Sequence, residues 1–400
     1  DGEIMTVESQ EEAVIDSSAT ATAVSASFSI GVSLAGGGAV TGTTLNTETR
    51  SWIDESTIHL TNDLLVHAMS NSVATPVVRA TAASFGLIAA AVAGTVSSVE
   101  VAPVLEAFIN ASVVTADDIK VSTGGGLLAA PETSGLSIST GISVGASVAT
   151  VKGIFSILAG LKDGNVIAAR SLTIQPYGEG RFYSKTEASS AGLLAGIAGS
   201  VSTIETEVVS SAILGDNNTI NVRTLQMTAN QTQDLDSKSD SLAVGLAAGT
   251  GAYVSTETLS RSVVDIGRNS NVTADTILLN SFLDLNKSLF SDQENGEGAN
   301  LSSGSAGLVS LTSLTSTTSI GSGSRPLASE VNIGEGTVMK AKSVFDIETL
   351  VKTYAKDSVQ IEGVSGFGVS LGDSQIAATT LSLVNVQGAT LENSEGEIYL

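Results

Sequence analysis

The sequence predicts an all-β fold, a parallel β-solenoid of about seven imperfect repeats of 53–67 residues in one elongated body, 1–400. Three observations predict it. A strand-like phrase recurs at near-constant spacing, a glycine-centred run of small residues precedes each copy, and Ser, Ala, Thr and Gly make up close to half of the chain. Repeats of this kind cannot bury an apolar face alone, so successive copies are expected to stack.

The recurring phrase is eight residues long. Positions 1, 6 and 8 are apolar, and position 3 is usually a small residue. The segment 114–121 (VTADDIKV) is one copy. Further copies lie at 167–174, 220–227 and 272–279. Within 114–121, Val114 and Ala116 point to the same face as Ile119 and Val121. Alternation of this kind is typical of a half-buried strand.

The second apolar residue of each phrase serves as an anchor. The anchors are Ile4, Leu64, Ile119, Leu172, Leu225, Ile277, Val344 and Ile398. They divide the chain into approximate repeats 4–63, 64–118, 119–171, 172–224, 225–276, 277–343 and 344–398. The longest repeat contains a polar excursion at 284–300, interpreted as one inserted surface loop. Pro76 and Pro131 each lie 12 residues after an anchor, so a turn is expected there.

The small-residue runs contain a glycine in every repeat: Gly31, Gly86, Gly141, Gly192, Gly245, Gly307 and Gly368. An all-helical solenoid is the alternative, because Ala-rich runs have high helix propensity. Breaks such as Gly249-Thr250-Gly251 favour strands instead. Small residues let two chain segments approach closely, which predicts a narrow interior. Whether each repeat forms one coil or two is left open by the spacing.

The charge balance excludes some partners. Forty-one acidic residues against 18 basic ones give a net charge of −23. No basic stripe is present, so a nucleic-acid partner is not expected, and anionic lipid is disfavoured. The absence of Cys rules out a disulfide scaffold and a zinc ribbon.

The run GLIAAAVAG at 86–94, followed by Val99-Glu-Val101 and the segment 106–121, resembles the repeats of giant secreted bacterial proteins. These are the filamentous haemagglutinin-like and leukotoxin-family filamentous adhesins and related β-strand repeat proteins. The resemblance covers nearly the whole chain. It implies a right-handed parallel β-helix, export to the cell surface of a prokaryote, and a role as stalk, fibre or adhesin. The repeats of these families share no catalytic residues that could be transferred.

Three groups of residues are candidates for a functional site. His59 and His67 with Asp63 could hold a metal ion, although no other repeat echoes them. The carboxylates Asp117-Asp118, and the trio Asp234, Asp236 and Asp240, could serve a polysaccharide-cleaving enzyme. Because each group lies in a polar segment expected at the surface, no catalytic, cofactor-binding or metal residue is predicted.

Two other kinds of binding site were considered. The chain has no calcium motif, since Gly124-Gly-Gly126 leads into Leu127-Leu128 and there is no EF-hand loop, so only weak calcium binding is expected. Trp52 and Tyr177 lie at different phases of the repeat, which argues against a sugar-stacking column.

The predicted function is a non-enzymatic, structural segment of an extracellular fibre or giant surface adhesin. Its expected partners are itself, through end-to-end stacking or further repeats, and a host-cell, neighbouring-cell or polysaccharide surface. The alternatives are a subunit of an envelope sheath or surface-layer lattice and a carbohydrate-active β-helix enzyme.

Overall fold

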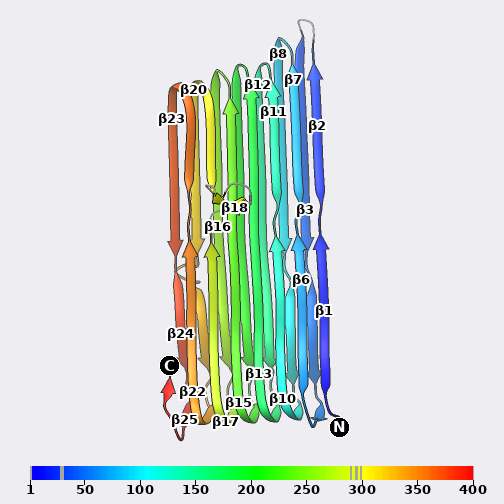
Figure 1. Cartoon of the computed structure of the whole chain (residues 1–400), viewed down its shortest axis with the longest axis vertical. Coiled ribbons are helices and arrows are strands. Elements are labelled where there is room, and N and C mark those ends of the chain that lie inside the picture. Colours follow the sequence, from blue (N-terminus) through cyan, green and yellow to red (C-terminus); the bar gives the residue numbers. More distant parts are fainter. Residues whose placement is uncertain (1, 28–30, 289–290, 293–295, 298–299, 400) are drawn as a thin grey trace.

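The computed structural model describes residues 2–27, 31–288, 291–292, 296–297 and 300–399. Within these residues the protein contains strands and no helix, and nearly all strands belong to one parallel sheet that winds into a solenoid (Figure 1). The predicted all-β parallel solenoid is therefore confirmed. Each repeat forms one coil, which answers the question that the spacing left open.

All coils follow the same path, which the coil of β13 and β14 illustrates. Strand β13 (Val166–Gly192) ascends, the chain turns at 193–194, and β14 (Ala195–Leu214) descends beside it (Figure 1). The ascending sheet consists of β1 (Met5–Ile15), β2 (Ser18–Ala26), β6 (Leu64–Ala74), β7 (Val77–Phe85), β10 (Val113–Ala129), β11 (Glu132–Ser139), β13, β15 (Thr219–Val244), β17 (Asn271–Lys287), β22 (Val338–Ala355) and the first parts of β20 (Leu301–Ile320) and β23 (Val359–Ala378). The descending sheet consists of β3 (Val32–Leu45), β4 (Glu48–Asp54), β8 (Ile88–Val101), β9 (Val104–Asn110), β12 (Ile142–Leu161), β14, β16 (Ala247–Ile266), the remainders of β20 and β23, β21 (Leu327–Ile333) and β24 (Thr380–Val386). The short strands are β5 (Thr57–His59), β25 (Thr390–Asn393), β26 (Ile398–Tyr399) and the antiparallel pair β18 (Ser291–Asp292) and β19 (Gly296–Glu297).

The coils pair in parallel and in register. Ile119 lies opposite Leu64 on one side and Leu172 on the other, as anchor opposite anchor. Two anchors are wrong by one residue, because Met5 pairs with Leu64 and Phe345 pairs with Ile277. A slip of one residue reverses the face of a strand, and both Ile4 and Val344 are accordingly exposed.

The recurring phrase covers two strand segments joined at a corner. Strand β10 pairs first with β5 and then with β6, and the register skips Asp117 between Ala116 and Asp118. Val114, Ala116, Ile119 and Val121 are all buried, so the predicted alternation holds on both sides of the corner. The corner adds a short third side to the lower end of each coil.

The interior changes in character along the strands. Near the corner it is filled by large aliphatic side chains such as Leu64, Ile119, Leu172 and Leu225. Near the upper turns it is filled by alanines and by Ser and Thr hydroxyls, which hydrogen-bond between strands: Ser84 to Ser33 (2.9 Å), Ser137 to Ser143 (3.1 Å) and Thr250 to Thr312 (3.0 Å). The two sheets therefore lie closer together at the upper end.

Two glycines mark this close approach. A Cβ atom on Gly196 would lie 2.4 Å from the carbonyl oxygen of Val244, and one on Gly145 would lie 2.5 Å from that of Ser189. In both cases the opposing atom is backbone of the facing sheet. No side chain larger than hydrogen fits at these positions.

The sixth coil carries two insertions where the sequence predicted one. Strand β17 continues to Lys287 and pairs on both sides, so residues 284–287 are not loop as predicted. The first insertion is 288–300, which takes the place of 236–238 in the preceding coil and 356–358 in the next. The second, at 321–326, contains Gly321 in the left-handed region (φ +65°) and was not predicted.

The turn expected at Pro76 and Pro131 is absent. Strands β6 and β7 run in the same direction on either side of Pro76, and β10 and β11 do so around Pro131. The amide of Glu132 still donates to the Pro76 carbonyl oxygen (2.9 Å). Because proline lacks an N–H, it interrupts the ladder for one residue without turning the chain.

The long dimension of the molecule follows the strands and not the stacking direction (Figure 1). A strand of 27 residues such as β13 spans roughly 90 Å, whereas seven coils about 4.8 Å apart stack to roughly 30 Å. The block is therefore wide and flat, unlike the elongated stack that the sequence predicts.

Candidate functional site

The candidate carboxylate pair, Asp117 and Asp118, lies at the lower corner, close to Asp63 of the preceding coil. One carboxylate oxygen from each of Asp63, Asp117 and Asp118 lies within 4.8 Å of the other two. Arg170 of the next coil already occupies this cluster: its Nε donates to Asp117 (2.9 Å) and its Nη2 contacts Asp118. The hydrogen bond and charge of Asp117, followed by the charge of Asp118, raise the pKa of Arg170 above its usual value.

The two histidines do not join this cluster. Nδ1 of His67 lies 3.0 Å from the Ser122 hydroxyl and 3.1 Å from the Ser122 carbonyl oxygen, in the adjacent coil. His59 lies on β5 opposite Thr115. The hypothetical site of His59, His67 and Asp63 is thus not assembled. Asp63 instead meets two carboxylates that the sequence assigned to a different group.

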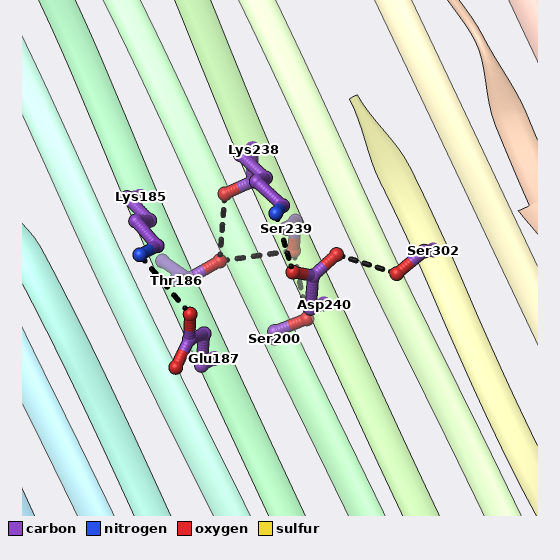
Figure 2. A network of polar contacts seen from close by, with 8 residues as sticks. All are labelled: Lys185, Thr186, Glu187, Ser200, Lys238, Ser239, Asp240 and Ser302. Carbon is purple, nitrogen blue, oxygen red and sulfur yellow. Dashed lines mark hydrogen bonds and ion pairs between the residues drawn. The ribbon is translucent and has the colours of Figure 1, made fainter. Parts of the chain in front are cut away.

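The second carboxylate group follows β15 on the outer face of the ascending sheet. Figure 2 shows its upper end, where Asp240 pairs with Lys238 (3.3 Å) and accepts a hydrogen bond from Ser302 (2.5 Å). Lower down, Asp234 accepts from Asn286 (3.3 Å). Asp236 is buried between them.

The neighbouring coil places one opposite charge and two like charges in register with this group. Arg181, Tyr183, Lys185 and Glu187 of β13 pair in register with Asp234, Asp236, Lys238 and Asp240. Burial first, and then the charge of Asp234, raises the pKa of Tyr183. Figure 2 also shows Lys185 beside Glu187 (3.2 Å). Asp234 and Asp240 thus each accept a hydrogen bond from an adjacent coil, whereas the ion pair of Glu187 lies within its own strand.

Below this surface, the same strands are joined by hydroxyls. Thr186 donates to Ser239 (3.0 Å), and Ser239 donates to Ser200 of the descending sheet (2.7 Å) (Figure 2). The chain of hydroxyls crosses the interior from one sheet to the other. It satisfies polar groups that would otherwise be costly to bury.

An open groove of about 1000 Å³ follows the lower corner across several coils. Equivalent positions line it in turn: Ala116, Ala169, Val222, Ala274 and Ala341. Arg223, Asp275, Lys340, Lys342 and Glu392 add charge of both signs, and Lys340 pairs with Glu392 (3.1 Å). The groove has small residues along its length, and its lining includes three basic and two acidic side chains.

One aromatic pair, Trp52 and Phe108, was not predicted from the sequence. Trp52 stacks beside Phe108 of the next coil, with ring centroids 6.2 Å apart, and the Lys162 ammonium lies 3.6 Å from the Phe108 centroid. Tyr177 lies on the other sheet. Phe108 lies opposite Trp52 in the register, so the aromatic partner of Trp52 is Phe108 and not Tyr177.

One buried ion pair and one exposed carboxylate also lie outside the groups that the sequence singled out. Lys287 and Asp357 form an ion pair with both side chains fully buried, and Thr318 donates to Asp357 (2.8 Å). On β16, partial burial first, and then the charges of Asp216 and Glu330, raise the pKa of Asp265. Neither group belongs to a recurring pattern, so the sequence contained no signal for them.

Comparison with protein-family models, with curated proteins and with solved structures yields no match. In the described parts of the chain, no helix has the length and apolar character needed to cross a membrane.

Proposed function

We propose that this protein is a structural segment of an extracellular prokaryotic fibre or giant surface adhesin, in which it acts as a stiff spacer. The observation that carries the proposal is the open edge at each end of the stack. In the described residues, β1–β4 pair with β6–β9 alone, and β23 and β24 pair with β20 and β21 alone. Unpaired edge strands are templates for a further coil.

The way the few basic residues are used supports a mechanical role. Arg50 pairs with Glu106 (2.9 Å) and Lys152 with Glu100 (3.1 Å), in each case across neighbouring coils. Arg170 does the same for the corner carboxylates. With 18 basic residues in the chain, this arrangement places cations where coils would otherwise repel one another.

The geometry also supports growth by addition. Each new coil adds about 4.8 Å and repeats the same hydrogen bonds, so length increases without a larger core. The excess of acidic residues disfavours sideways association of the charged surfaces. Adhesion to a cell or polysaccharide surface would arise from many weak contacts along such an array.

The test is assembly through the open edge of the last coil. The Thr379 amide donates to Ile320 and its carbonyl accepts from Leu327. In a parallel strand the adjacent residue points its amide the other way, so the Ala378 amide faces the open edge. Ala378→Pro removes that donor and leaves the existing ladder intact, and Ala378→Ser is the matched control.

Electron microscopy and sedimentation at rising protein concentration give the readout. We expect end-to-end stacks that lengthen with concentration, that persist in Ala378→Ser and that shorten in Ala378→Pro. Monomers at every concentration, or equal stacking in both variants, would contradict assembly through this edge. Release of reducing ends from a panel of polysaccharides would favour the enzyme alternative.

A further inference from the structure

Charge is absent from one end of every coil. The uncharged segments are 17–47, 80–99, 133–151, 188–204, 241–256, 298–324 and 363–372. The register stacks them side by side around the upper turns. In a chain of net charge −23, the described residues of this end therefore form one continuous surface without a charged side chain.

Large apolar side chains project from this surface. At the turns they are Leu87, Leu193, Leu194, Leu246, Leu308 and Phe367, which we call the apolar rim. Leu87 is 73% exposed and Phe367 is 80% exposed. Below the rim, the descending sheet adds Val92, Ile197 and Leu311 in a single outward row that also includes Gly249. We call the rim and the uncharged part of the descending sheet together the apolar end.

The apolar end reverses the usual distribution of polarity. Its interior holds Ser and Thr hydroxyls, such as Ser137, Ser143 and Thr250, whereas the leucines of its rim face outward. The reason is the close approach of the two sheets at Gly145 and Gly196, which leaves no room for a leucine at these interior positions. The exposed leucines are thus not side chains that a small rearrangement of this coil could bury.

We propose that the apolar end docks against the apolar end of a second copy of this chain. Charge selects this occupant. Apart from the open edges, any other face of one copy brings acidic side chains against those of the next, whereas the two apolar ends meet without like-charge repulsion. The flat row containing Gly249 and Ile197 suits packing of one sheet upon another at about 10 Å.

The size of the surface fits a stable pair. Seven coils give a width of roughly 30 Å, and about ten uncharged residues per descending strand give a height of roughly 33 Å. The face therefore measures on the order of 1000 Å². A standard interface uses about 800 Å² from each partner, and the largest apolar patch of an ordinary monomer covers about 300–600 Å².

A lipid surface fits less well. The apolar end has no Lys or Arg to contact phosphate headgroups and no Trp, the side chain typical of the membrane interface. The net charge of the whole chain would also repel an anionic bilayer. Vesicle binding is therefore an outcome to be tested against self-association.

The test compares two isoleucines that face outward on the same sheet. Ile197 lies in the apolar end and is 50% exposed, whereas Ile154 lies in the charged half and is 40% exposed. Ile197→Asp and Ile154→Asp are made in the Ala378→Pro background, so that stacking through the open edge does not contribute. Leu246→Asp is a second rim variant, and far-ultraviolet circular dichroism checks that each variant is folded.

Sedimentation velocity gives the dissociation constant of the dimer at 0.15 and 0.5 M NaCl. We expect a dimer in the parent and in Ile154→Asp, and a dissociation constant raised by about tenfold or more in Ile197→Asp and Leu246→Asp, because a carboxylate would be buried in the interface. Higher salt should not dissociate the dimer, since salt screens the repulsion of the two acidic bodies.

Three outcomes would overturn the proposal. They are a monomer throughout the concentration range, an equal weakening by Ile197→Asp and Ile154→Asp, and a monomer that binds neutral phosphatidylcholine vesicles through the rim. Because the open edge of the last coil is blocked in these measurements, failure here would leave the proposed spacer function untouched. Conversely, if the chain with Ala378 intact fails to stack end to end while the Ala378→Pro chain still dimerises, the spacer model alone would be contradicted.

Discussion

Gly196 offers the sharpest test of the narrow interior. In Gly196→Ala the new Cβ would lie 2.4 Å from the Val244 carbonyl oxygen and 3.1 Å from its carbonyl carbon. Both atoms are backbone of the facing sheet, so no side chain can rotate away. The two sheets must separate locally or the strand must shift. The matched control is Gly249→Ala, because a Cβ there would have no heavy atom within 4 Å.

The expected magnitudes have opposite signs. Overpacking of a close-packed interior costs about 1–3 kcal/mol. Replacing an unconstrained glycine with alanine stabilises by about 0.4–1 kcal/mol, chiefly through the unfolded chain. The two variants should therefore differ by roughly 1.5–4 kcal/mol in local stability. Each adds a single methyl group, and the two positions lie in adjacent coils.

Native-state hydrogen exchange is the suitable assay, because repeat arrays open locally and a single midpoint averages over coils. In dilute solution, amides around Gly196 should exchange about 5- to 150-fold faster in Gly196→Ala, since each 1.4 kcal/mol is a factor of ten. The lower aliphatic core should be unchanged. Unchanged exchange in Gly196→Ala, or equal effects of the two substitutions, would refute the close approach of the sheets.

Three further predictions concern charged groups. Lys287→Met should cost about 3–5 kcal/mol because it leaves Asp357 buried without its cation, and Lys287→Met combined with Asp357→Leu should recover most of that loss in denaturant unfolding. The raised pKa of Asp265 means that the folded state holds this proton more tightly than the unfolded state; its contribution to stability is present below the ordinary Asp pKa and is lost as pH rises through the folded value. Asp265→Asn should therefore stabilise the protein at pH 7 and leave it unchanged at low pH, as seen in melting temperatures across pH; equal shifts at both pH values would contradict this. Arg170→Gln should create calcium affinity at the corner carboxylates, detectable by calorimetry, which Asp63→Asn added to the same variant should abolish; equal calcium binding in the parent would show that Arg170 does not block the site.

The repeat and its strand character could be predicted because they depend on local pattern. Alternation at Val114, Ala116, Ile119 and Val121 follows from the geometry of a strand, and in-register stacking then brings like residues together. The same logic failed at Val344, because the register shifts between Ala274 and Thr276 and moves the buried position to Phe345.

The candidate sites were less predictable because they join residues from different coils. Asp63 meets Asp117 and Asp118 across one coil, and Arg170 reaches them from the next. Such a grouping becomes visible in the sequence only after the register is known to the residue. The sequence predicts Lys287 in a surface loop, whereas β17 continues to this residue. The spacing of the repeats therefore did not indicate that Lys287 pairs with Asp357.

The interruptions of the ascending sheet lie in one row. Pro76, Pro131, Ser184 and Ser237 occupy equivalent positions in successive coils, and the insertion 288–300 enters the same row in the sixth. Ser288 still donates to Leu235, and Ser239 to Asn300, on either side of it. A coil can thus acquire a new loop at this row while its neighbours keep their hydrogen bonds. Extra segments could therefore be gained, lost or exchanged here one coil at a time, which makes the row a natural place for related chains to diverge in what they display.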